Sequence, residues 1–242
     1  MKTTKIEWTD RTWNPVTGCT KVSAGCAHCY AEMMTRRLAA MGLEKYSRGF
    51  IPTTHEECLV EPYKWKKPHK IFVCSMSDLF HESVPDSFID KVLLVISNTT
   101  YHSYQLLTKR AERMQQYFTT HPIPRNVWLG VTVDVCESKS RIDFLRTLDA
   151  PVKFLSCEPL LEDLRTINLQ GIDWVIVGGE SGRLARPMKE EWVLNIQHQA
   201  ESQGAYFFFK QWGTWGSDGI KRSKHTNGKF LNGKIVQEMP LK

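Results

Sequence analysis

The stretch DWVIVGGESG, residues 173–182, carries the pattern that decides the fold. Four consecutive apolar residues, 174–177, are followed at once by two glycines, Glu180 and Ser181. A continuous apolar run is typical of a strand that is buried on both faces, as in a parallel sheet. The polar and small residues after it mark the carboxyl end of the strand, where parallel α/β folds bind their ligands.

The same pattern recurs along the chain. Apolar runs that end in polar or small residues are found at KIFVCSMSD (70–78), YQLLTKR (104–110), VWLGVTVD (127–134), VKFLSCEPL (152–160) and AYFFFKQWG (205–213). Helix-like segments are predicted at 30–42, 87–98, 137–148 and 189–202. This alternation indicates βαβ units. With a weaker strand at 11–16, it predicts an α/β fold, a partial (β/α) barrel of about six to seven parallel strands. A doubly wound open sheet is the alternative.

The C-terminal residues have a different composition. From Gly213 onward the chain is rich in Gly, Lys and Trp and has little periodicity. The segment KFLNGKIVQ (229–237) holds Asn232-Gly233 between short apolar runs, which is a signal for a type I′ hairpin. We therefore expect a barrel over residues 1–212 and a C-terminal extension with a β-hairpin over residues 213–242.

Composition and charge limit the class of protein. The chain has 242 residues, of which 41% are hydrophobic, and this argues against a disordered chain. No apolar run approaches the roughly 20 residues that span a bilayer, and the N-terminus lacks the apolar region of a secretory signal. We therefore expect a cytoplasmic protein without membrane contact. The net charge of +6 permits an anionic partner such as nucleic acid, and equally an ordinary solvated basic surface.

The stretch GCTKVSAGCAHCYAE, residues 18–32, brings together Cys19, Cys26 and Cys29. In a reducing compartment, clustered cysteines more often bind metal or carry out chemistry than form disulfides. An iron–sulfur cluster uses all three thiols and leaves one iron open. A structural zinc site needs a fourth ligand, either His28 or a remote residue. A redox pair uses only Cys26 and Cys29, so the residues themselves leave these three alternatives open.

Six blocks of the sequence resemble a phage and bacterial family of unknown function that carries a three-cysteine motif. The blocks are WTDRTWNPVTGCTKVSAGCAHCYAE, FVCSMSDLF, WLGVTVD, SCEPLLEDL, WVIVGGESG and FFKQWG, and the resemblance runs over residues 6–240. That family is similar to the radical S-adenosylmethionine enzymes and distantly to spore photoproduct lyase, a DNA-repair enzyme. The resemblance implies that Cys19, Cys26 and Cys29 ligate a 4Fe–4S cluster, whose open iron binds S-adenosylmethionine.

The chain departs from the common pattern of the radical enzymes in three respects. Six residues separate Cys19 from Cys26, where three are usual, and His28 precedes the last cysteine. After the second predicted strand, SMSD (75–78) stands where a Gly-Gly-Glu often holds the amino group of the cofactor. The Gly-Gly-Glu at 178–180 lies on a later strand, so that role is not transferred to it.

Polar and small residues at the strand ends are candidates to bind the cofactor. A carboxylate with hydroxyls suits an ammonium group, a lysine beside Arg110 suits a carboxylate or phosphate, and a glycine pair lets the backbone approach a ligand closely. Each set has a structural alternative as helix cap, basic helix start or tight turn. The candidates are Ser75, Ser77, Asp78, Lys109, Thr132, Asp134, Glu158, Gly178, Gly179 and Glu180.

Two further features concern the substrate. By the same resemblance, Cys157 is a candidate to return a hydrogen atom to a substrate radical; the alternative is an inert buried cysteine. Trp212 and Trp215, together with KRSKHTNGK (221–229), place aromatic rings beside positive charge. That combination suits stacking on bases and pairing with phosphates, unless the tryptophans cover the barrel.

The sequence therefore predicts a radical S-adenosylmethionine-like iron–sulfur enzyme that acts on nucleic acid or a nucleotide, in phage-related DNA repair or modification. Such an enzyme needs an electron donor and leaves room for a partner protein. The first alternative is a non-catalytic iron–sulfur or zinc protein that binds nucleic acid or a partner protein. A metal-dependent nuclease or deaminase is less favoured, because no carboxylate cluster is recognisable.

Overall fold

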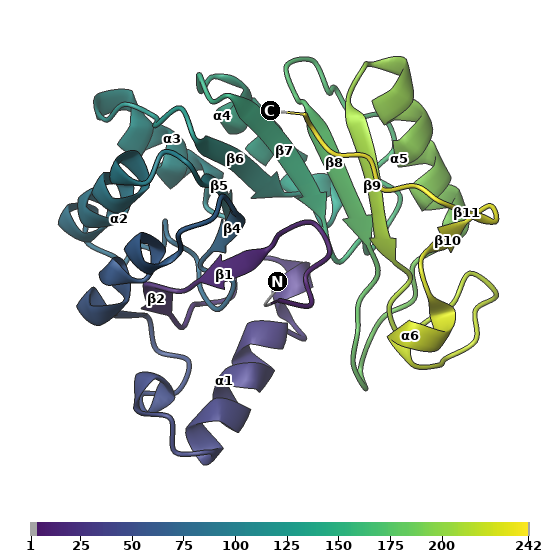
Figure 1. The fold of residues 1–242 in the computed structure, drawn as a ribbon. Coiled ribbons are helices and arrows are strands. Elements are labelled where there is room, and N and C mark those ends of the chain that lie inside the picture. The colour runs from purple at the N-terminus through teal and green to yellow at the C-terminus, as the bar shows by residue number, and fades with distance from the viewer. Residues whose placement is uncertain (1–3, 242) are drawn as a thin grey trace. The chain divides into compact units, whose positions relative to one another are not determined.

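A computed structural model describes residues 4–241 and has the expected α/β fold (Figure 1). Seven strands form one parallel sheet in the order β1-β4-β5-β6-β7-β8-β9, which is their order along the chain, as in a partial (β/α) barrel. The sheet strands are β1 (Arg11–Trp13), β4 (Lys70–Val73), β5 (Ser103–Thr108), β6 (Val127–Thr132), β7 (Val152–Cys157), β8 (Trp174–Gly178) and β9 (Tyr206–Gln211).

The other elements are helices and two short antiparallel pairs. The helices are α1 (Tyr30–Ala40), α2 (Asp86–Asn98), α3 (Ala111–Thr120), α4 (Ser140–Arg146), α5 (Glu190–Ser202) and α6 (Lys224–Asn227). The pairs are β2 (Val16–Thr17) with β3 (Thr53–Thr54), and β10 (Phe230–Leu231) with β11 (Lys234–Ile235). Single turns of 3-10 helix include η1 (Ala24–Cys26) and η5 (Cys136–Lys139), which leads into α4.

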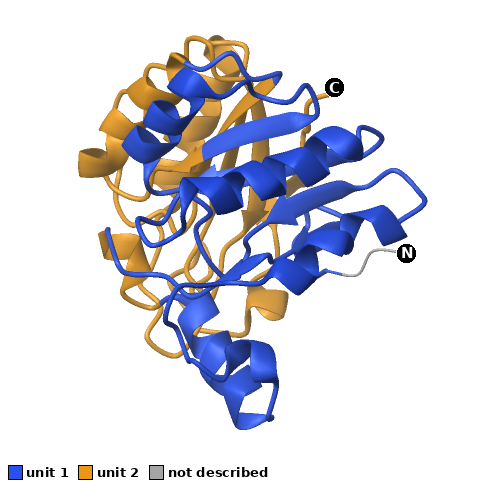
Figure 2. Cartoon of the chain, turned by 90° about the vertical axis from the view of Figure 1, so that its left-hand side faces the viewer, with its two compact units in different colours: residues 1–22, 29–130, 148–151 blue, residues 23–28, 131–147, 152–242 orange. Residues whose placement is uncertain are grey.

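The chain divides into two compact units (Figure 2). Unit 1 comprises Met1–Val22, Cys29–Gly130 and Leu148–Pro151, and unit 2 comprises Ser23–His28, Val131–Thr147 and Val152–Lys242. The division passes through the cysteine loop, because residues 23–28 belong to unit 2 and the residues on both sides of them to unit 1. The boundary expected at residue 213 remains a prediction.

Unit 1 contains β1, β4 and β5 with helices α1, α2 and α3. Arg11 pairs with Ile71, and Lys70 pairs with Ser103, so the three strands run in parallel and in step. Helix α2 follows Pro85, whose fixed φ suits the start of a helix. It buries an apolar face made of Phe88, Ile89, Val92, Leu93, Val95 and Ile96. The carboxyl ends of the strands in this unit are therefore held on a packed core.

Unit 2 contains β7, β8 and β9 with helices α4 and α5. Every residue of β8 is buried, as the continuous apolar run predicts for a strand covered on both faces. Helix α5 has two glutamates in its first turn, where negative charge is favourable, and it packs on β8 and β9. Glu158 directly follows β7, and Glu180 follows β8 after one glycine.

The hairpin expected in the C-terminal segment is confirmed as β10 and β11. Asn232 and Gly233 both have positive φ, as a type I′ turn requires. The chain after the hairpin continues along β9, since the amide of Phe209 donates to the carbonyl of Val236 at 2.7 Å. Within residues 4–241, no helix is long and apolar enough to cross a membrane.

Candidate functional site: the cysteine loop and the strand ends

The cysteine loop presents three partly exposed thiols. Cys19, Cys26 and Cys29 are each intermediate in exposure, and all seven cysteines of the chain are thiols rather than disulfides. Cys26 ends η1, and Cys29 is the residue immediately before α1. In contrast, Cys58, Cys74 and Cys157 are buried. The exposure of the loop thiols therefore separates them from the cysteines of the core.

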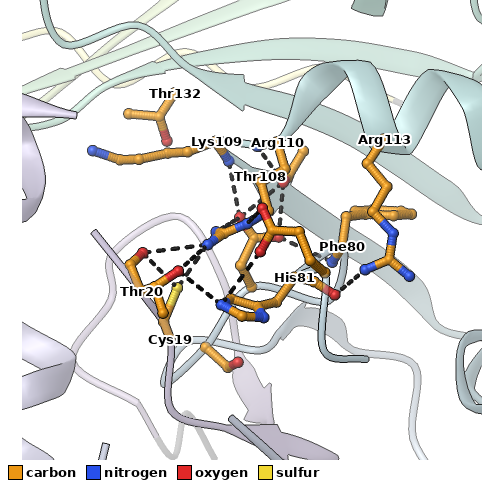
Figure 3. A network of polar contacts seen from close by, with 12 residues as sticks. Cys19, Thr20, Phe80, His81, Thr108, Lys109, Arg110, Arg113 and Thr132 are labelled. Atoms are coloured by element: carbon orange, nitrogen blue, oxygen red, sulfur yellow. Dashed lines mark hydrogen bonds and ion pairs between the residues drawn. The ribbon is translucent and has the colours of Figure 1, made fainter. Parts of the chain in front are cut away.

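A buried arginine holds the first cysteine in unit 1 (Figure 3). Arg110 follows β5, and its side chain is only 5% exposed. Its guanidinium donates to the Sγ of Cys19 at 3.5 Å, to the hydroxyl of Thr20 at 2.8 Å and to the carbonyl of Thr20 at 3.3 Å. The same group pairs with Asp78 at 3.3 Å and with Glu82 at 2.9 Å. A fixed guanidinium therefore lies beside the Cys19 sulfur.

Asp78 is the buried counterpart of this arginine. Its carboxylate accepts from the hydroxyl of Thr108 at 2.7 Å and from the amides of Phe80 at 3.0 Å and Lys109 at 3.1 Å. Burial alone would lower the pKa of Arg110, but the charges of Asp78 and the Cys19 sulfur outweigh burial and raise that pKa. Asp78 thus uses its oxygens to fix the end of β5 and Arg110.

His81 supports the loop beside Arg110. The amide of Ser83 donates to its Nδ1 at 3.0 Å, so a neutral His81 carries its proton on Nε2, which lies 2.9 Å from the hydroxyl of Thr20. Burial, and then the charge of Arg110, lower the pKa of His81. A neutral imidazole is therefore the form that completes this network.

In unit 2, a second buried carboxylate holds the middle of the loop. Asp134 follows β6 and is fully buried. Its Oδ2 accepts from the hydroxyl of Ser23 at 2.6 Å and from the amide of Gly25 at 2.9 Å. The other oxygen lies 3.5 Å from the guanidinium of Arg141. A residue that the sequence marks as a ligand candidate thus binds the chain next to Cys26.

A third carboxylate, Glu180, follows β8 and is 6% exposed. Arg186 donates to it from its backbone amide at 2.8 Å, from Nε at 2.9 Å and from Nη2 at 2.6 Å. The Nδ1 of His28 lies 3.2 Å away, and Arg186 also donates to the carbonyl of Ala24 at 3.1 Å. Burial raises the pKa of Glu180, but the hydrogen bonds from Arg186 outweigh burial and lower it. Glu180 therefore acts as an anion held against the loop.

The chemistry of the loop fits a metal cluster in the type of its donors. Three thiols that solvent reaches, one of them beside a guanidinium, are ligands that iron–sulfur clusters and zinc both accept. However, no three or more His, Cys, Asp or Glu side chains within residues 4–241 form a group that could hold a metal ion. The fit therefore rests on donor type and on spacing along the chain.

The remaining candidates in unit 1 contact their own backbone. The hydroxyl of Ser75 donates to the side chain of Asn14 at 3.1 Å, and the hydroxyl of Ser77 donates to the carbonyl of Gly18. The backbone amide of Lys109 donates to the carboxylate of Asp78 at 3.1 Å. Ser77 thus adds a further anchor at the start of the cysteine loop.

The remaining candidates in unit 2 lie at the ends of β6, β7 and β8. Thr132 is buried, and its carbonyl accepts from Arg141 at 2.7 Å. Glu158 pairs with Lys210 at 3.0 Å, with side chains 14% and 25% exposed. A Cβ on Gly178 would lie 2.6 Å from a carboxylate oxygen of Glu158, and one on Gly179 would overlap the carbonyl of Trp212. The two glycines thus permit close packing within the protein itself.

The features assigned to the substrate are mostly enclosed. Cys157 is fully buried, and burial raises the pKa of its thiol. Trp212 is 2% exposed, and its indole nitrogen donates to the carbonyl of Phe230 at 2.9 Å. Trp215 donates to the carbonyl of Ala185 at 2.6 Å, and Lys221 lies over its ring at 5.6 Å. Both tryptophans therefore have internal hydrogen-bond partners, and a role in binding nucleic acid remains a prediction.

Sequence reasoning missed several members of these networks, among them Arg186 and His81. Arg186 lies in a loop six residues after Glu180, and His81 follows the SMSD block at a distance of three residues. Neither residue belongs to a regular strand or helix. The only available signal was the presence of a charged or polar side chain soon after a predicted strand end, and many loop residues share that property.

Comparisons with known proteins provide a family but not an activity. No protein of curated function matches the sequence. Among solved structures, the chain is similar to one described as "Spore photoproduct lyase complexed with dinucleoside spore photoproduct", with a TM-score of 0.42 and 10% sequence identity. The match covers 77% of this chain and 59% of that chain, so this chain spans about three-fifths of the solved structure. A family model described as "Protein of unknown function (DUF5131)" matches residues 3–240, and the chain belongs to this family.

Proposed function

We propose that this chain is an iron–sulfur protein whose cluster is ligated by Cys19, Cys26 and Cys29. We further propose that it uses S-adenosylmethionine in radical chemistry on nucleic acid or a nucleotide. The observation that carries the proposal is the set of three partly exposed thiols in a loop that follows β1, beside the carboxyl ends of parallel strands. Ligands of α/β folds bind at such ends.

The environment of Cys19 supports ligation. A metal ligand is the thiolate rather than the thiol, and a neighbouring guanidinium stabilises that form. Arg110 supplies such a group at 3.5 Å and is itself fixed by Asp78. A 4Fe–4S cluster held by three thiolates has one open iron, which is the position that binds S-adenosylmethionine in the radical enzymes. The chain's own residues would orient the loop and the substrate.

The candidate residues separate into two groups under this proposal. The carboxylates of Asp78, Asp134 and Glu180 hold the chain around the cysteines. To bind the cofactor as well, they would have to give up these internal hydrogen bonds for bonds to S-adenosylmethionine. Glu158 with Lys210, at the ends of β7 and β9, is a partly exposed ion pair that is suited to polar groups of a ligand. Cys157 stays a proposal as hydrogen donor, and it would need a path from its buried position to the substrate.

The alternative is a non-catalytic iron–sulfur or zinc protein that binds nucleic acid or a partner protein. One observation favours it: Asp78, Asp134 and Glu180 are occupied by internal hydrogen bonds and ion pairs. A protein that only binds a cluster needs no free carboxylates for a cofactor. The lysine-rich segment at 221–229 is then the natural place for contact with phosphates.

The test is to purify the full chain without oxygen and to measure iron, sulfide, zinc and the ultraviolet–visible spectrum. We expect about four irons per chain and a broad charge-transfer band, both lost in Cys19→Ala, Cys26→Ala and Cys29→Ala. Cys136→Ala is the matched control, because Cys136 is a partly exposed thiol outside the loop. Unchanged iron in all three loop variants would refute the ligand assignment.

A second assay separates the enzyme from the alternative. The reconstituted protein is incubated with S-adenosylmethionine and a strong reductant, and release of 5′-deoxyadenosine is followed by chromatography. Release that depends on the three cysteines supports the enzyme. A bound cluster without release supports the non-catalytic protein. Zinc in place of iron would make the loop a structural zinc site and would also support the non-catalytic protein.

A further inference from the structure

We propose that Asp134 and Glu180 are positioning residues of the cysteine loop, and that they hold the segment Ser23–His28, which carries Cys26, in one conformation. The inference rests on the proposed function, because it assigns the two carboxylates a role in presenting Cys26 as a ligand. It also replaces their expected role in binding the cofactor.

The contacts of Asp134 are made with the loop itself. A single oxygen accepts both the hydroxyl of Ser23 and the amide of Gly25, at 2.6 and 2.9 Å. These two donors flank Ala24, the first residue of the turn η1 that ends at Cys26. A carboxylate that accepts a backbone amide and a hydroxyl is an effective N-terminal anchor of such a turn. Asp134 therefore fixes the backbone at Gly25, the residue directly before Cys26.

Glu180 and its partner Arg186 together contact residues on both sides of Cys26. Arg186 binds Glu180 in a bidentate manner and donates a further bond to the carbonyl of Ala24 at 3.1 Å. The Nδ1 of His28 lies 3.2 Å from Oε2 of Glu180, the oxygen that also accepts from Nε of Arg186. The backbone before Cys26 and the side chain after it are thus tied to one buried anion.

Both carboxylates are buried, which increases the free energy that is lost when one of these contacts is removed. Asp134 is 0% and Glu180 is 6% exposed, so solvent replaces a lost partner poorly. Bidentate arginine–carboxylate pairs are also among the stronger hydrogen bonds in proteins. An exposed glycine-containing loop would otherwise sample many conformations. Precise placement of ligands by such supporting groups is what metal sites require.

The first measurement is amide hydrogen exchange of the full chain without metal. We expect residues 23–28 to exchange about ten- to a hundredfold faster in Asp134→Asn and in Glu180→Gln, as follows from the loss of a charged hydrogen bond. Exchange of α5 should stay unchanged, which shows that the unit remains folded. Asp218→Asn is the control, because Asp218 forms a bidentate pair with Arg222 instead of the loop. Unchanged exchange at 23–28 in both variants would overturn the proposal.

Two variants of the partner residues, Ser23→Ala and Arg186→Gln, cover the case in which a variant of a buried carboxylate does not fold. Ser23→Ala removes one donor to Asp134, and Arg186→Gln removes the link to Ala24, while both carboxylates remain. Faster exchange at 23–28 in these variants supports the proposal, and unchanged exchange refutes it. Glu180→Asp serves as the conservative variant and should restore part of the protection.

The second measurement concerns the ligand. After reconstitution with iron and sulfide, we expect iron loss to a chelator to be at least about tenfold faster in Asp134→Asn and Glu180→Gln than in the wild type and in Asp218→Asn. We also expect an altered electron paramagnetic resonance spectrum of the reduced cluster. Faster exchange with unchanged iron loss and spectrum would refute a role in positioning. A wild-type chain without iron would refute the proposed function, whereas the exchange result would still decide whether the carboxylates hold the loop.

Discussion

Replacing Arg110 by methionine tests whether one buried guanidinium organises the strand ends of unit 1. The change keeps an unbranched side chain of similar reach and removes the positive charge. The side chains of Arg110 and Asp78 are 5% and 8% exposed, so both charges are largely shielded from water. The substitution leaves Asp78 without its ion pair and Thr20 without two donors.

The cost follows from what remains around Asp78. Removal of one partner of a buried ion pair typically costs about 3–5 kcal/mol, because the other charge stays buried. Asp78 still accepts from the Thr108 hydroxyl and from the amides of Phe80 and Lys109. These bonds place the expected loss at the lower end, about 3 kcal/mol. Glu82 is 65% exposed, so its pair with Arg110 contributes less than about 1 kcal/mol.

Urea unfolding measures this loss. We expect Arg110→Met to lower the free energy of unfolding by about 3 kcal/mol, and a double-mutant cycle with Asp78→Asn to give a coupling of about 1–3 kcal/mol. Glu82→Gln is the control on the same arginine and should cost less than about 1 kcal/mol. A loss below about 1 kcal/mol for Arg110→Met, or additive effects in the cycle, would refute the assignment of Arg110–Asp78 as the central pair.

Three further predictions concern other parts of the structure. Burial lowers the pKa of His81, so the stabilisation by neutral His81 is complete above its ordinary pKa of about 6.5 and is lost as pH falls through the lower folded value. The difference in unfolding free energy between wild type and His81→Gln, measured from pH 7.5 to about 5, should therefore become smaller at acid pH. A difference that stays constant with pH would contradict this. Cys157→Ser should lower the free energy of unfolding by about 1–3 kcal/mol more than Cys157→Ala, because it buries a hydroxyl in a fully enclosed site. Thermal unfolding compares the two variants. Equal midpoints would show that water reaches the hydroxyl and would contradict the prediction. Gly178→Ala should lower the free energy of unfolding by about 1–3 kcal/mol, because the added methyl group displaces Glu158 from Lys210. Gly204→Ala is the control, since this position has open space and positive φ and so reports backbone strain alone. Similar losses of unfolding free energy in both variants would argue against the steric reason.

The sheet could be predicted because its strands are apolar without interruption. The apolar runs predict strands β4 to β9, and in the structure each of these strands ends before the last residues of its run. Helix α3 was missed. Its buried face consists of Ala111, Met114, Tyr117 and Phe118, and polar residues fill the rest of the helix. That short amphipathic stretch lies next to a basic strand end, so its period is easy to overlook.

The site could be predicted only in part, because its contacts join distant parts of the chain. Asp134 was identified as a polar residue at a strand end, but its partner Ser23 lies 111 residues earlier. Arg110 and Cys19 are 91 residues apart. Local patterns show which side chains reach the carboxyl edge of a sheet. They do not show whether a carboxylate there meets a ligand or another part of its own chain.

From these contacts we expect the cysteine loop to be ordered in the protein without metal. Each unit anchors its own part of the loop: Arg110 holds Cys19 and Thr20, and Asp134 with Glu180 holds residues 23–28. Ordering a flexible segment opposes binding by about 1–2 kcal/mol per residue, so a loop already held by buried charges presents its thiols at lower cost. A buried charge that loses its partner costs about 3–5 kcal/mol, so these contacts resist rearrangement. Within each unit, the buried charges therefore favour a fixed conformation of the part of the loop that they contact.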